Sequence, residues 1–378
     1  MTRSIPFNRP YVAPDALARI EQALHARHFS GDGPATKQCH EILSAAHNGA
    51  GALLTTSCTH ALELAALLLD LVRDDEVIVP SFAFTSTVNA FVLRGARPVF
   101  ADVRPDTLNL DEKRIEELVT ERTRAICLIH YAGVAAEMEG IGRIAKAHDL
   151  EVVEDNAHGL FGKYRGAPLG TFGTVSALSF HETKNFSCGE GGAIIVNDRA
   201  LFDRAEVLRE KGTNRAAFFR GFVDKYTWVD VGSSYLPSEL LAAFLLAQLE
   251  RREEIQQRRR QIFERYQREL SSWASQNGVQ LPCVPNGASP AYHLFYMIFP
   301  DLDSRTRAIQ ALRGRGVQAV FHYLPLHLSP MGQRFGQARG DCPVTERVSD
   351  GLLRLPFFNE LTDAEQSQVI DAVTSVTV

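Results

Sequence analysis

The chain contains 378 residues, of which 45% are hydrophobic and 22% are charged, and its formal net charge is −5. This length exceeds what one hydrophobic core usually fills, so a large domain with a smaller one is expected. The arginine-rich segment at residues 251–260 also carries acids, and no long basic block is present, which argues against a nucleic-acid partner.

Six cysteines are scattered along the chain without a CxxC pair or a Cys/His ligand spacing. Neither a zinc site nor a disulfide framework is therefore predicted. Residues 1–14 lack the apolar core of a signal peptide. The longest apolar stretch, residues 61–72, is interrupted by Glu63 and Asp70, which indicates a core helix and not a membrane span. We expect a cytoplasmic, reduced protein with no membrane partner.

Strands and helices alternate along the first half of the chain, after two opening helices at residues 15–28 and 37–47. Such alternation is typical of a mainly parallel sheet with helices on both faces, so the sequence predicts an α/β fold. The predicted strands are 52–54, 76–79, 98–101, 125–130 and 151–154, and the predicted helices between them are 58–71, 86–93, 111–118 and 138–147.

The pattern changes after a hairpin whose strands are predicted at residues 175–180 and 193–196. A nearly continuous helix is predicted at 240–270, followed by strands at 292–299 and 317–322 and helices at 304–315 and 363–374. We interpret the long helix as a bridge. The predicted domains are a large cofactor-binding α/β domain at 1–245 and a smaller α+β domain at 246–378, against which the N-terminal segment can pack.

The loop of this hairpin contains Lys184, which follows a buried strand end and precedes the glycines at 189–192. Glycines allow backbone to approach a ligand closely. A lysine that loses hydration in such a place has a lowered pKa and can attack a carbonyl. The alternative is an ordinary surface lysine in a hairpin.

Two other features of the sequence can bind an anion. Residues 53–60 lead from a strand into a helix through small hydroxyl side chains, and a helix N-terminus attracts phosphate. An ordinary N-cap cluster explains this stretch equally well. Ser179, five residues before Lys184, is a further candidate phosphate donor.

The strand end VVEDNAH, at residues 152–158, closes with two acids, and acids are rarely buried without partners. Asp155 can face a cationic ring nitrogen, with His158 beside it, or it can cap the following turn. Phe84 follows another strand end and can cover the flat face of a heterocycle, although aromatics in such places usually belong to the core.

A phosphate cradle, an acid for a ring nitrogen, a stacking ring and a carbonyl-reactive lysine together fit one cofactor, pyridoxal 5′-phosphate (PLP). Each signal alone is weak, and their combination in this order is specific.

From Ile5 to the C-terminal helix, the chain resembles the DegT/DnrJ/EryC1/StrS family of sugar aminotransferases, which are fold-type I PLP enzymes. The resemblance implies a large α/β domain with a smaller α+β domain. The matching stretches are GDGPATKQCHE, TSCTHALELAALLL, DEVIVPSFAFTSTVNAF, ADVRPDTLNLD, VVEDNAHG, SFHETKN, GEGGAIIVND and VFHYLPLH.

The resemblance also implies roles for individual residues. His158 stands where many relatives have glutamine, and both side chains can hydrogen-bond the ring oxygen. Ser234 stands where much of the family has an asparagine that reaches the phosphate of the partner subunit, and Leu236 replaces an arginine. The implied catalytic residues are Lys184, which bonds to the cofactor aldehyde, and Asp155. The implied cofactor-binding residues are Thr59, His60, Phe84, Asp155, His158, Ser179, Lys184 and Ser234. The implied substrate contacts are Asn185, Tyr323 and His327.

Two longer stretches, REKGTNRAAFFRG and DKYTWVDVGSSYLPSELLAA, are more specific. They resemble the branch of the family that aminates C4 of TDP-4-keto-6-deoxy-D-glucose, giving TDP-4-amino-4,6-dideoxy-D-galactose for enterobacterial common antigen. The resemblance implies L-glutamate as donor, a cofactor that alternates between PLP and pyridoxamine 5′-phosphate, and a homodimer with shared active sites.

Three alternatives stay open. One is an aminotransferase for another nucleotide-linked keto sugar. A second is a PLP-dependent sugar dehydratase, although relatives with that chemistry carry histidine at the position of Lys184. The third is a non-catalytic regulator, which should have lost Lys184 or Asp155, and both are present.

Overall fold

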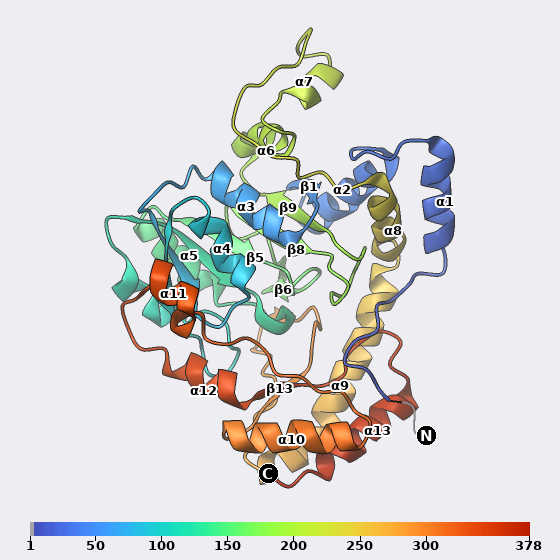
Figure 1. Cartoon of the computed structure of the whole chain (residues 1–378), viewed down its shortest axis with the longest axis vertical. Coiled ribbons are helices and arrows are strands. Elements are labelled where there is room, and N and C mark those ends of the chain that lie inside the picture. The colour runs from blue at the N-terminus through green and yellow to red at the C-terminus, as the bar shows by residue number, and fades with distance from the viewer. Residues whose placement is uncertain (1–3) are drawn as a thin grey trace.

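An eight-stranded sheet forms the centre of the molecule in the computed structural model, which describes residues 4–378 (Figure 1). Its strands are β1 (Gly51–Thr55), β2 (Glu76–Pro80), β3 (Arg97–Ala101), β4 (Thr123–Ile129), β5 (Glu151–Asp155), β8 (Val175–Ser179), β9 (Gly192–Val196) and β12 (Gln337–Ala338). Their order across the sheet is β1-β9-β8-β5-β4-β2-β3-β12. Within this sheet all strands run parallel except β9, which is antiparallel to both of its neighbours.

Helices cover both faces of the sheet, because side chains alternate along each strand and both sets are apolar. In β1, for example, Leu53 packs against α3 (Cys58–Leu68), whereas Leu54 packs against α8 (Glu239–Leu249). The predicted α/β fold with a mainly parallel sheet is confirmed. The first face is covered by α3, α4 (Thr85–Val92) and α6 (Phe202–Arg209), and the second by α2 (Pro34–Ala46), α5 (Met138–Ala147) and α8.

A smaller unit follows the long helix α9 (Arg252–Gln276), which runs from the sheet region to the opposite end of the molecule (Figure 1). Strands β11 (Tyr296–Ile298) and β13 (Leu352–Arg354) form its antiparallel pair. Helices α10 (Leu302–Gly314) and α13 (Asp363–Thr374) complete its core with α9. Ile5 is buried in the same core, and its N–H donates to Gly316 O at 2.8 Å.

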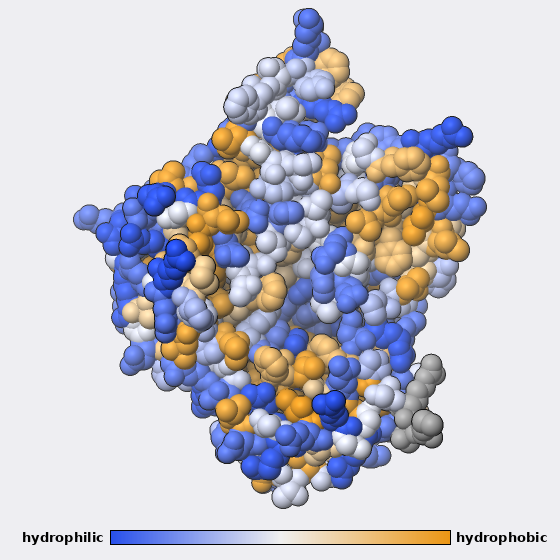
Figure 2. All heavy atoms as spheres, in the orientation of Figure 1, coloured by the Kyte–Doolittle hydropathy of each residue, from blue (hydrophilic) through white to orange (hydrophobic). Residues whose placement is uncertain are grey.

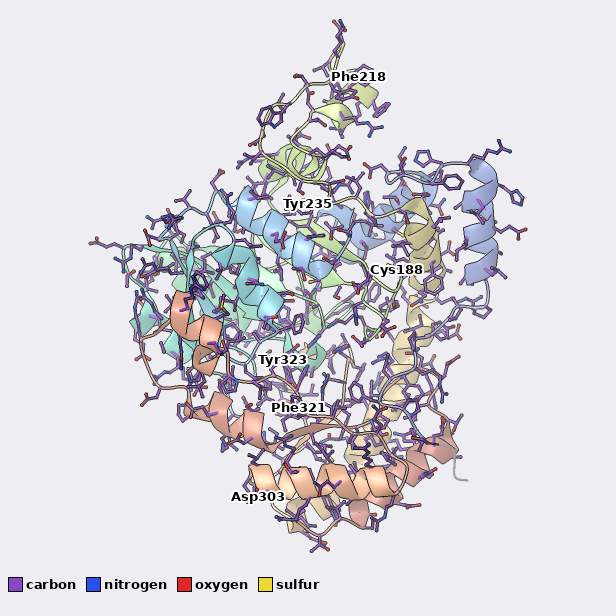
Figure 3. All side chains as sticks on the ribbon, in the orientation of Figure 1. Cys188, Phe218, Tyr235, Asp303, Phe321 and Tyr323 are labelled. Carbon is purple, nitrogen blue, oxygen red and sulfur yellow. The ribbon has the colours of Figure 1, made fainter. Side chains whose placement is uncertain are left out.

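Residues 210–237, which we call the arm, connect α6 to α8; the part around Phe218 projects from the rest of the molecule, whereas Tyr235 lies in the core (Figures 1 and 3). No helix in the described residues is long and apolar enough to cross a membrane.

The remaining elements are helices α1 (Ala16–Ala26), α7 (Arg215–Phe219), α11 (Pro330–Phe335) and α12 (Pro343–Gly351), the small sheet of β6 (Lys163–Tyr164), β7 (Ala167–Pro168) and β10 (Ala288–Ser289), and 3₁₀ turns η1 (Glu112–Arg114), η2 (Glu116–Leu118), η3 (Tyr131–Gly133), η4 (Arg199–Leu201) and η5 (Leu326–Leu328).

Two predicted helices differ in the structure. Residues 111–118 form the 3₁₀ turns η1 and η2, because the buried side chains of this segment, Ile115 and Leu118, are spaced by three residues, which is one 3₁₀ turn. The helix predicted at 240–270 is two helices, α8 and α9. Arg251 interrupts it with φ −101° and ψ 19°, and its side chain is drawn to Asp15 at 3.0 Å.

The strands predicted at 292–299 and 317–322 are also shorter or absent. Only Tyr296–Ile298 forms a strand, and Tyr292 has a φ of 53°, which breaks extended structure. Residues 317–322 form single bridges, from Val317 to Ile5 and from Val320 to Arg354. The strand that pairs with β11 is β13, which the sequence analysis did not predict.

Candidate active site

The predicted site residues at the strand ends converge because β9 approaches the N-terminus of α3. Gly192 pairs with Ser179 on one side and with Thr55 on the other. A Cβ on Gly192 would lie 2.4 Å from the Ser57 carbonyl carbon and from the Cys58 nitrogen. Only glycine permits this approach, which brings Ser179 beside the first turn of α3.

The first turn of α3 forms an anion cradle. Ser57 caps the helix, and its Oγ accepts from His60 N at 3.1 Å. The first N–H groups of a helix lack acceptors within the helix and carry its positive dipole end, so they attract phosphate. Thr59 Oγ1 lies 2.8 Å from Ser86 Oγ, so a second helix start, that of α4, contributes another hydroxyl.

Asp155 ends β5 and is almost fully buried. Its Oδ2 accepts from Thr87 Oγ1 at 2.6 Å, and its Oδ1 accepts from Ala157 N at 3.2 Å. No cation in the described chain forms an ion pair with it, and burial raises its pKa. A cationic ring nitrogen facing Asp155 would compensate this burial and keep the carboxyl ionised.

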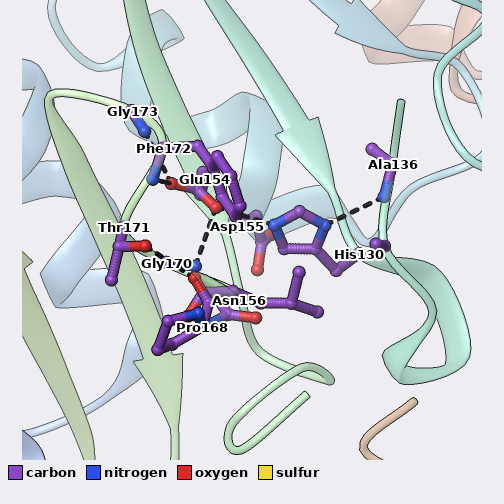
Figure 4. A network of polar contacts seen from close by, with 12 residues as sticks. His130, Ala136, Glu154, Asp155, Asn156, Pro168, Gly170, Thr171, Phe172 and Gly173 are labelled. Atoms are coloured by element: carbon purple, nitrogen blue, oxygen red, sulfur yellow. Dashed lines mark hydrogen bonds and ion pairs between the residues drawn. The ribbon is translucent and has the colours of Figure 1, made fainter. Parts of the chain in front are cut away.

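Glu154, the residue before Asp155, anchors the strand end through a buried network (Figure 4). One carboxylate oxygen accepts from Phe172 N and Gly173 N, both at 2.7 Å. The other accepts from Gly170 N and lies 2.8 Å from His130 Nε2. Burial alone would raise the pKa of Glu154, but these donors lower it below its usual value.

The hydrogen bonds of His130 define its tautomer. Its Nδ1 accepts from Ala136 N at 3.1 Å, so Nε2 carries the proton and donates to Glu154. Every partner of Glu154 in this network is therefore a donor. The network holds the end of β5 in place and with it the carboxyl of Asp155.

Lys184 lies on the hairpin between β8 and β9, at the same edge of the sheet. The hairpin is closed by a hydrogen bond from Glu182 N to Gly189 O at 2.9 Å. In the described chain, Nζ of Lys184 forms no hydrogen bond or ion pair. Burial lowers the pKa of Lys184 to about 8, although Cys58 and Asp155 oppose the shift. A neutral, unbonded amine is therefore accessible near neutral pH.

Rings from four segments form a wall beside Lys184, which we call the imidazole–phenol wall. His158 stacks on His293 with centroids 4.1 Å apart, and Tyr323 Oη lies 3.5 Å from His158 Nε2. His322 stacks on Tyr323 at 3.6 Å and lies 2.7 Å from Tyr131 Oη through Nδ1. Figure 3 shows Tyr323 near the middle of the molecule.

The histidines of this wall are neutral, because burial holds the pKa values of His158, His293 and His322 well below 6.5. Nδ1 of His158 is buried and has no hydrogen-bond partner within the described chain. A buried polar atom without a partner is costly, so this nitrogen is suited to a ligand hydroxyl.

The structure places other predicted residues further from this centre. Phe84 is 56% exposed, and its ring centroid lies 6.2 Å from that of Tyr323. Ser234 is exposed on the arm. His327 Nδ1 lies 2.6 Å from Ser81 Oγ, which ties it to the end of β2.

The polar groups of two further predicted residues, Asn185 and His60, are hydrogen-bonded within the protein. Asn185 Nδ2 donates to Ala291 O at 2.7 Å, and its Oδ1 lies 3.0 Å from His293 Nδ1, so it orients His293. The N–H of His60 is taken by the Ser57 cap, and its Nδ1 is hydrogen-bonded to Thr56 Oγ1.

Sequence reasoning missed several residues that the structure brings to the site. Thr87 and Ser86 lie in the quoted stretch DEVIVPSFAFTSTVNAF, and hydroxyls at the start of a helix after a strand end were an available signal. His293 carries no local signal, because it reaches the site from the smaller unit.

These residues fit PLP. The start of α3, Thr59 and Ser179 would hold its phosphate, Asp155 would face its ring nitrogen, and the unpartnered Nδ1 of His158 would meet its ring oxygen. The free amine of Lys184 would meet its aldehyde.

Comparisons with known proteins agree with this interpretation. Residues 10–374 match the DegT/DnrJ/EryC1/StrS aminotransferase family. Spore coat polysaccharide biosynthesis protein SpsC of Bacillus subtilis is 31% identical, over 98% of this chain and 97% of that protein. The crystal structure of the aminotransferase TlmJ of Streptoalloteichus hindustanus has a TM-score of 0.90 at 30% identity and covers 98% of both chains. Spr1654 of Streptococcus pneumoniae in its PLP form has a TM-score of 0.89 at 25% identity, over 99% of this chain and 98% of that one.

The Glu154 network yields a prediction for stability. Glu154→Gln places an amide NH₂ among partners that are all donors, so at least one hydrogen bond is lost and one donor faces another. We expect the free energy of unfolding to fall by about 2 kcal/mol, measured by urea denaturation. The matched control is Glu151→Gln, an exposed acid at the start of the same strand, which should change it by less than about 0.5 kcal/mol. Equal effects of the two substitutions would contradict a structural role for the network.

The lowered pKa of Lys184 yields a prediction for cofactor capture. Only the neutral amine attacks an aldehyde, and a pKa of about 8 makes Lys184 mostly neutral above pH 8. The rate at which cofactor-free protein captures PLP should therefore rise with pH up to about 8 and then level off, as followed by absorbance. A rate that still rises steeply between pH 9 and 10 would indicate an ordinary lysine.

Proposed function

The chain belongs to the DegT/DnrJ/EryC1/StrS aminotransferase family, and we propose that within it this protein aminates C4 of TDP-4-keto-6-deoxy-D-glucose. It is a PLP-dependent sugar aminotransferase. The proposed amino donor is L-glutamate and the proposed product is TDP-4-amino-4,6-dideoxy-D-galactose. The choice of sugar is supported by the resemblance of the stretches REKGTNRAAFFRG and DKYTWVDVGSSYLPSELLAA to the branch with that activity.

One observation carries the catalytic part of this proposal: the unbonded amine of Lys184, with its pKa near 8, shares one site with Asp155 and the anion cradle. PLP supplies the aldehyde that accepts the amino group and a ring that withdraws electrons from the reacting carbon. Lys184 would hold the aldehyde, and its amine would carry the proton at the reacting carbon. Asp155, held by Thr87, would stabilise positive charge on the ring nitrogen.

The imidazole–phenol wall suits a sugar ring. Its histidines are neutral, and with the phenols of Tyr131 and Tyr323 they offer hydrogen bonds without net charge. A hexose is itself uncharged near its ketone, so such a surface binds it without an unmatched charge. Tyr323, which faces His158, contacts the sugar, and Asn185 acts on it indirectly by orienting His293.

The protein functions as a homodimer in this proposal. The arm carries exposed rings, with Phe219 70%, Phe222 74% and Trp228 76% exposed. A second apolar area covers α1 and α8 (Figure 2) and includes Leu17, which is 77% exposed. Contiguous apolar surface of this kind is typical of an interface between subunits. In a two-fold dimer both copies exchange the same surface, so Ser234 on each arm would serve the partner's phosphate site.

The proposal predicts a specific product and a specific attachment site. Purified protein incubated with PLP, L-glutamate and TDP-4-keto-6-deoxy-D-glucose should form TDP-4-amino-4,6-dideoxy-D-galactose, identified by NMR. Borohydride treatment of the holoenzyme should attach the pyridoxyl group to Lys184, identified by peptide mass spectrometry. The stereoisomer with an equatorial amine, or amination at C3 of a 3-keto isomer only, would refute the sugar assignment. Label on another lysine would refute the site.

The shared dimer predicts complementation between two inactive chains. Lys184→Ala removes the amine, and Ser234→Asp places a negative charge where the partner's phosphate would bind. A purified heterodimer of the two variants contains one intact site, so we expect about half the activity of the wild-type dimer. The control heterodimer combines Lys184→Ala with Asp155→Asn. Because those residues serve the same site from one chain, it should stay inactive. An inactive first heterodimer would refute the shared site.

A further inference from the structure

The two ring nitrogens of His293 have different surroundings. Nδ1 lies 3.0 Å from Asn185 Oδ1. Nε2 forms no hydrogen bond within the described chain, although the residue as a whole is only 8% exposed. Unlike Nδ1 of His158, however, Nε2 of His293 is not sealed from solvent. One nitrogen is therefore held by the protein, and the other is open to a ligand.

The orientation of the Asn185 amide follows from its other contacts. Its Nδ2 donates to Ala291 O at 2.7 Å and lies 3.4 Å from Gln256 Oε1. A backbone carbonyl can only accept, so the reversed amide would place Oδ1 of Asn185 against another oxygen. Nδ2 therefore faces Ala291, and Oδ1, which can only accept, faces Nδ1 of His293.

These contacts define the tautomer of His293. A neutral imidazole has one N–H, and Nδ1 must carry it in order to donate to Asn185 Oδ1. Burial holds the pKa of His293 well below 6.5, and the nearby charges of Lys184 and Arg259 lower it further, so no second proton is added near neutral pH. Nε2 is then a lone pair that can only accept a hydrogen bond.

The ring of His293 is fixed beside the reactive amine. Its backbone N–H donates to Ala132 O at 3.2 Å, and its carbonyl oxygen accepts from Arg259 Nη2. The ring stacks on that of His158 with the two planes 24° apart. Because the charge of Lys184 contributes to the lowered pKa of His293, a ligand group at Nε2 lies near the space that Lys184 serves.

A nitrogen that can only accept selects a ligand group that can donate. In the proposed keto sugar, the two carbons beside the ketone differ: C3 carries a hydroxyl, whereas C5 carries the methyl group and closes the ring through oxygen. Of these substituents, only the C3 hydroxyl can donate a hydrogen bond. A site that is built to hydrogen-bond a hydroxyl rejects the analogue that lacks it, because a polar group of the protein is then left without a partner.

We propose that Nε2 of His293 accepts a hydrogen bond from the C3 hydroxyl of the keto sugar, and that Asn185 is the positioning residue that keeps this nitrogen an acceptor. This inference rests on the proposed function, from which it takes the sugar. His293 is thus a specificity residue that distinguishes a hydroxyl from hydrogen or fluorine on the carbon beside the ketone.

The binding experiment uses TDP-6-deoxy-D-glucose, which has no ketone and cannot react, and two analogues in which hydrogen or fluorine replaces the C3 hydroxyl. Each is titrated by calorimetry into the pyridoxamine 5′-phosphate form of the enzyme. Fluorine is similar in size to a hydroxyl but cannot donate, so both analogues should bind about 10-fold more weakly than the parent sugar. A fluoro analogue that binds as well as the parent sugar would show that no donor is needed, and the proposal would be wrong.

His293→Asn removes the acceptor and retains the inner contact, because the Nδ2 of asparagine takes the place of Nδ1 in the bond to Asn185. This variant should bind the three sugars with affinities that agree within about two-fold, and its affinity for TDP should stay unchanged.

The matched control is His47→Asn. His47 is also a buried histidine whose Nδ1 is hydrogen-bonded within the protein, to Leu43 O at 2.7 Å. His47→Asn should keep the preference for the C3 hydroxyl. If His293→Asn keeps this preference as well, or if His47→Asn also loses it, the proposal is overturned.

The tautomer is tested without a sugar, by ¹⁵N NMR of the holoenzyme labelled at histidine. The signals of His293 are those that are missing from the spectrum of His293→Asn. In the wild type, Nδ1 should have the chemical shift of a protonated nitrogen and Nε2 that of an unprotonated one; the reverse would overturn the proposal. Asn185→Leu removes the acceptor and should move both signals toward the average of the two tautomers, and unchanged signals would contradict the positioning role of Asn185.

Failure of the proposed function gives a different pattern. If the wild type neither binds TDP-6-deoxy-D-glucose nor converts the keto sugar, the proposed function is refuted together with the hydroxyl contact. The nitrogen shifts would still decide whether Asn185 sets the tautomer of His293. If the wild type converts the keto sugar but binds all three sugars equally, the proposed function stands and the role of His293 is refuted.

Discussion

The reversal of strand β9 is the constraint on which the site depends. A parallel sheet places all of its carboxyl ends at one edge, but it offers no tight turn at that edge. Because β9 returns antiparallel to β8, the connection between them, residues 180–191, stays at one edge of the sheet, and Lys184 is held on it at the edge where Asp155 ends β5. The same reversal requires Gly192, since any side chain there would collide with the start of α3. The antiparallel strand β9 thus brings together the amine of Lys184, the carboxyl of Asp155 and the N-terminus of α3.

Loss of hydration sets the pKa values of the side chains that lie at this edge of the sheet. Burial lowers the pKa of Lys184 to about 8, raises that of Asp155 and keeps the histidines of the wall neutral. Each shift makes a group reactive or leaves it in need of a partner. Glu154 shows the contrast, because its donors from the backbone and His130 satisfy it fully and its pKa is lowered. The strand thus ends in one acid whose donors lower its pKa and one whose burial outweighs the hydrogen bonds from Thr87 and Ala157.

Local signals in the sequence predicted what lies within a few residues of a strand end. Lys184, Asp155 and Ser179 were predicted as site residues because a buried strand, a polar turn and glycines are contiguous in the chain. His60 shows the limit of such signals: the start of a helix was recognised, but its N–H and ring are used by Ser57 and Thr56. The wall was beyond local reasoning, since it joins residues from four segments. β13 was missed because three residues carry too little periodicity, and its pairing depends on β11.

A transaminase site must bind two substrates in turn, one with a carboxylate beside the reacting carbon and one without. A single fixed cation would favour the amino acid and leave an unpaired charge when the sugar is bound. In this fold the larger unit supplies Lys184 and Asp155, while the smaller unit supplies Tyr323 and the ring of His293. Because burial keeps His293 neutral, these groups leave no unpaired charge when an uncharged sugar ring lies against them.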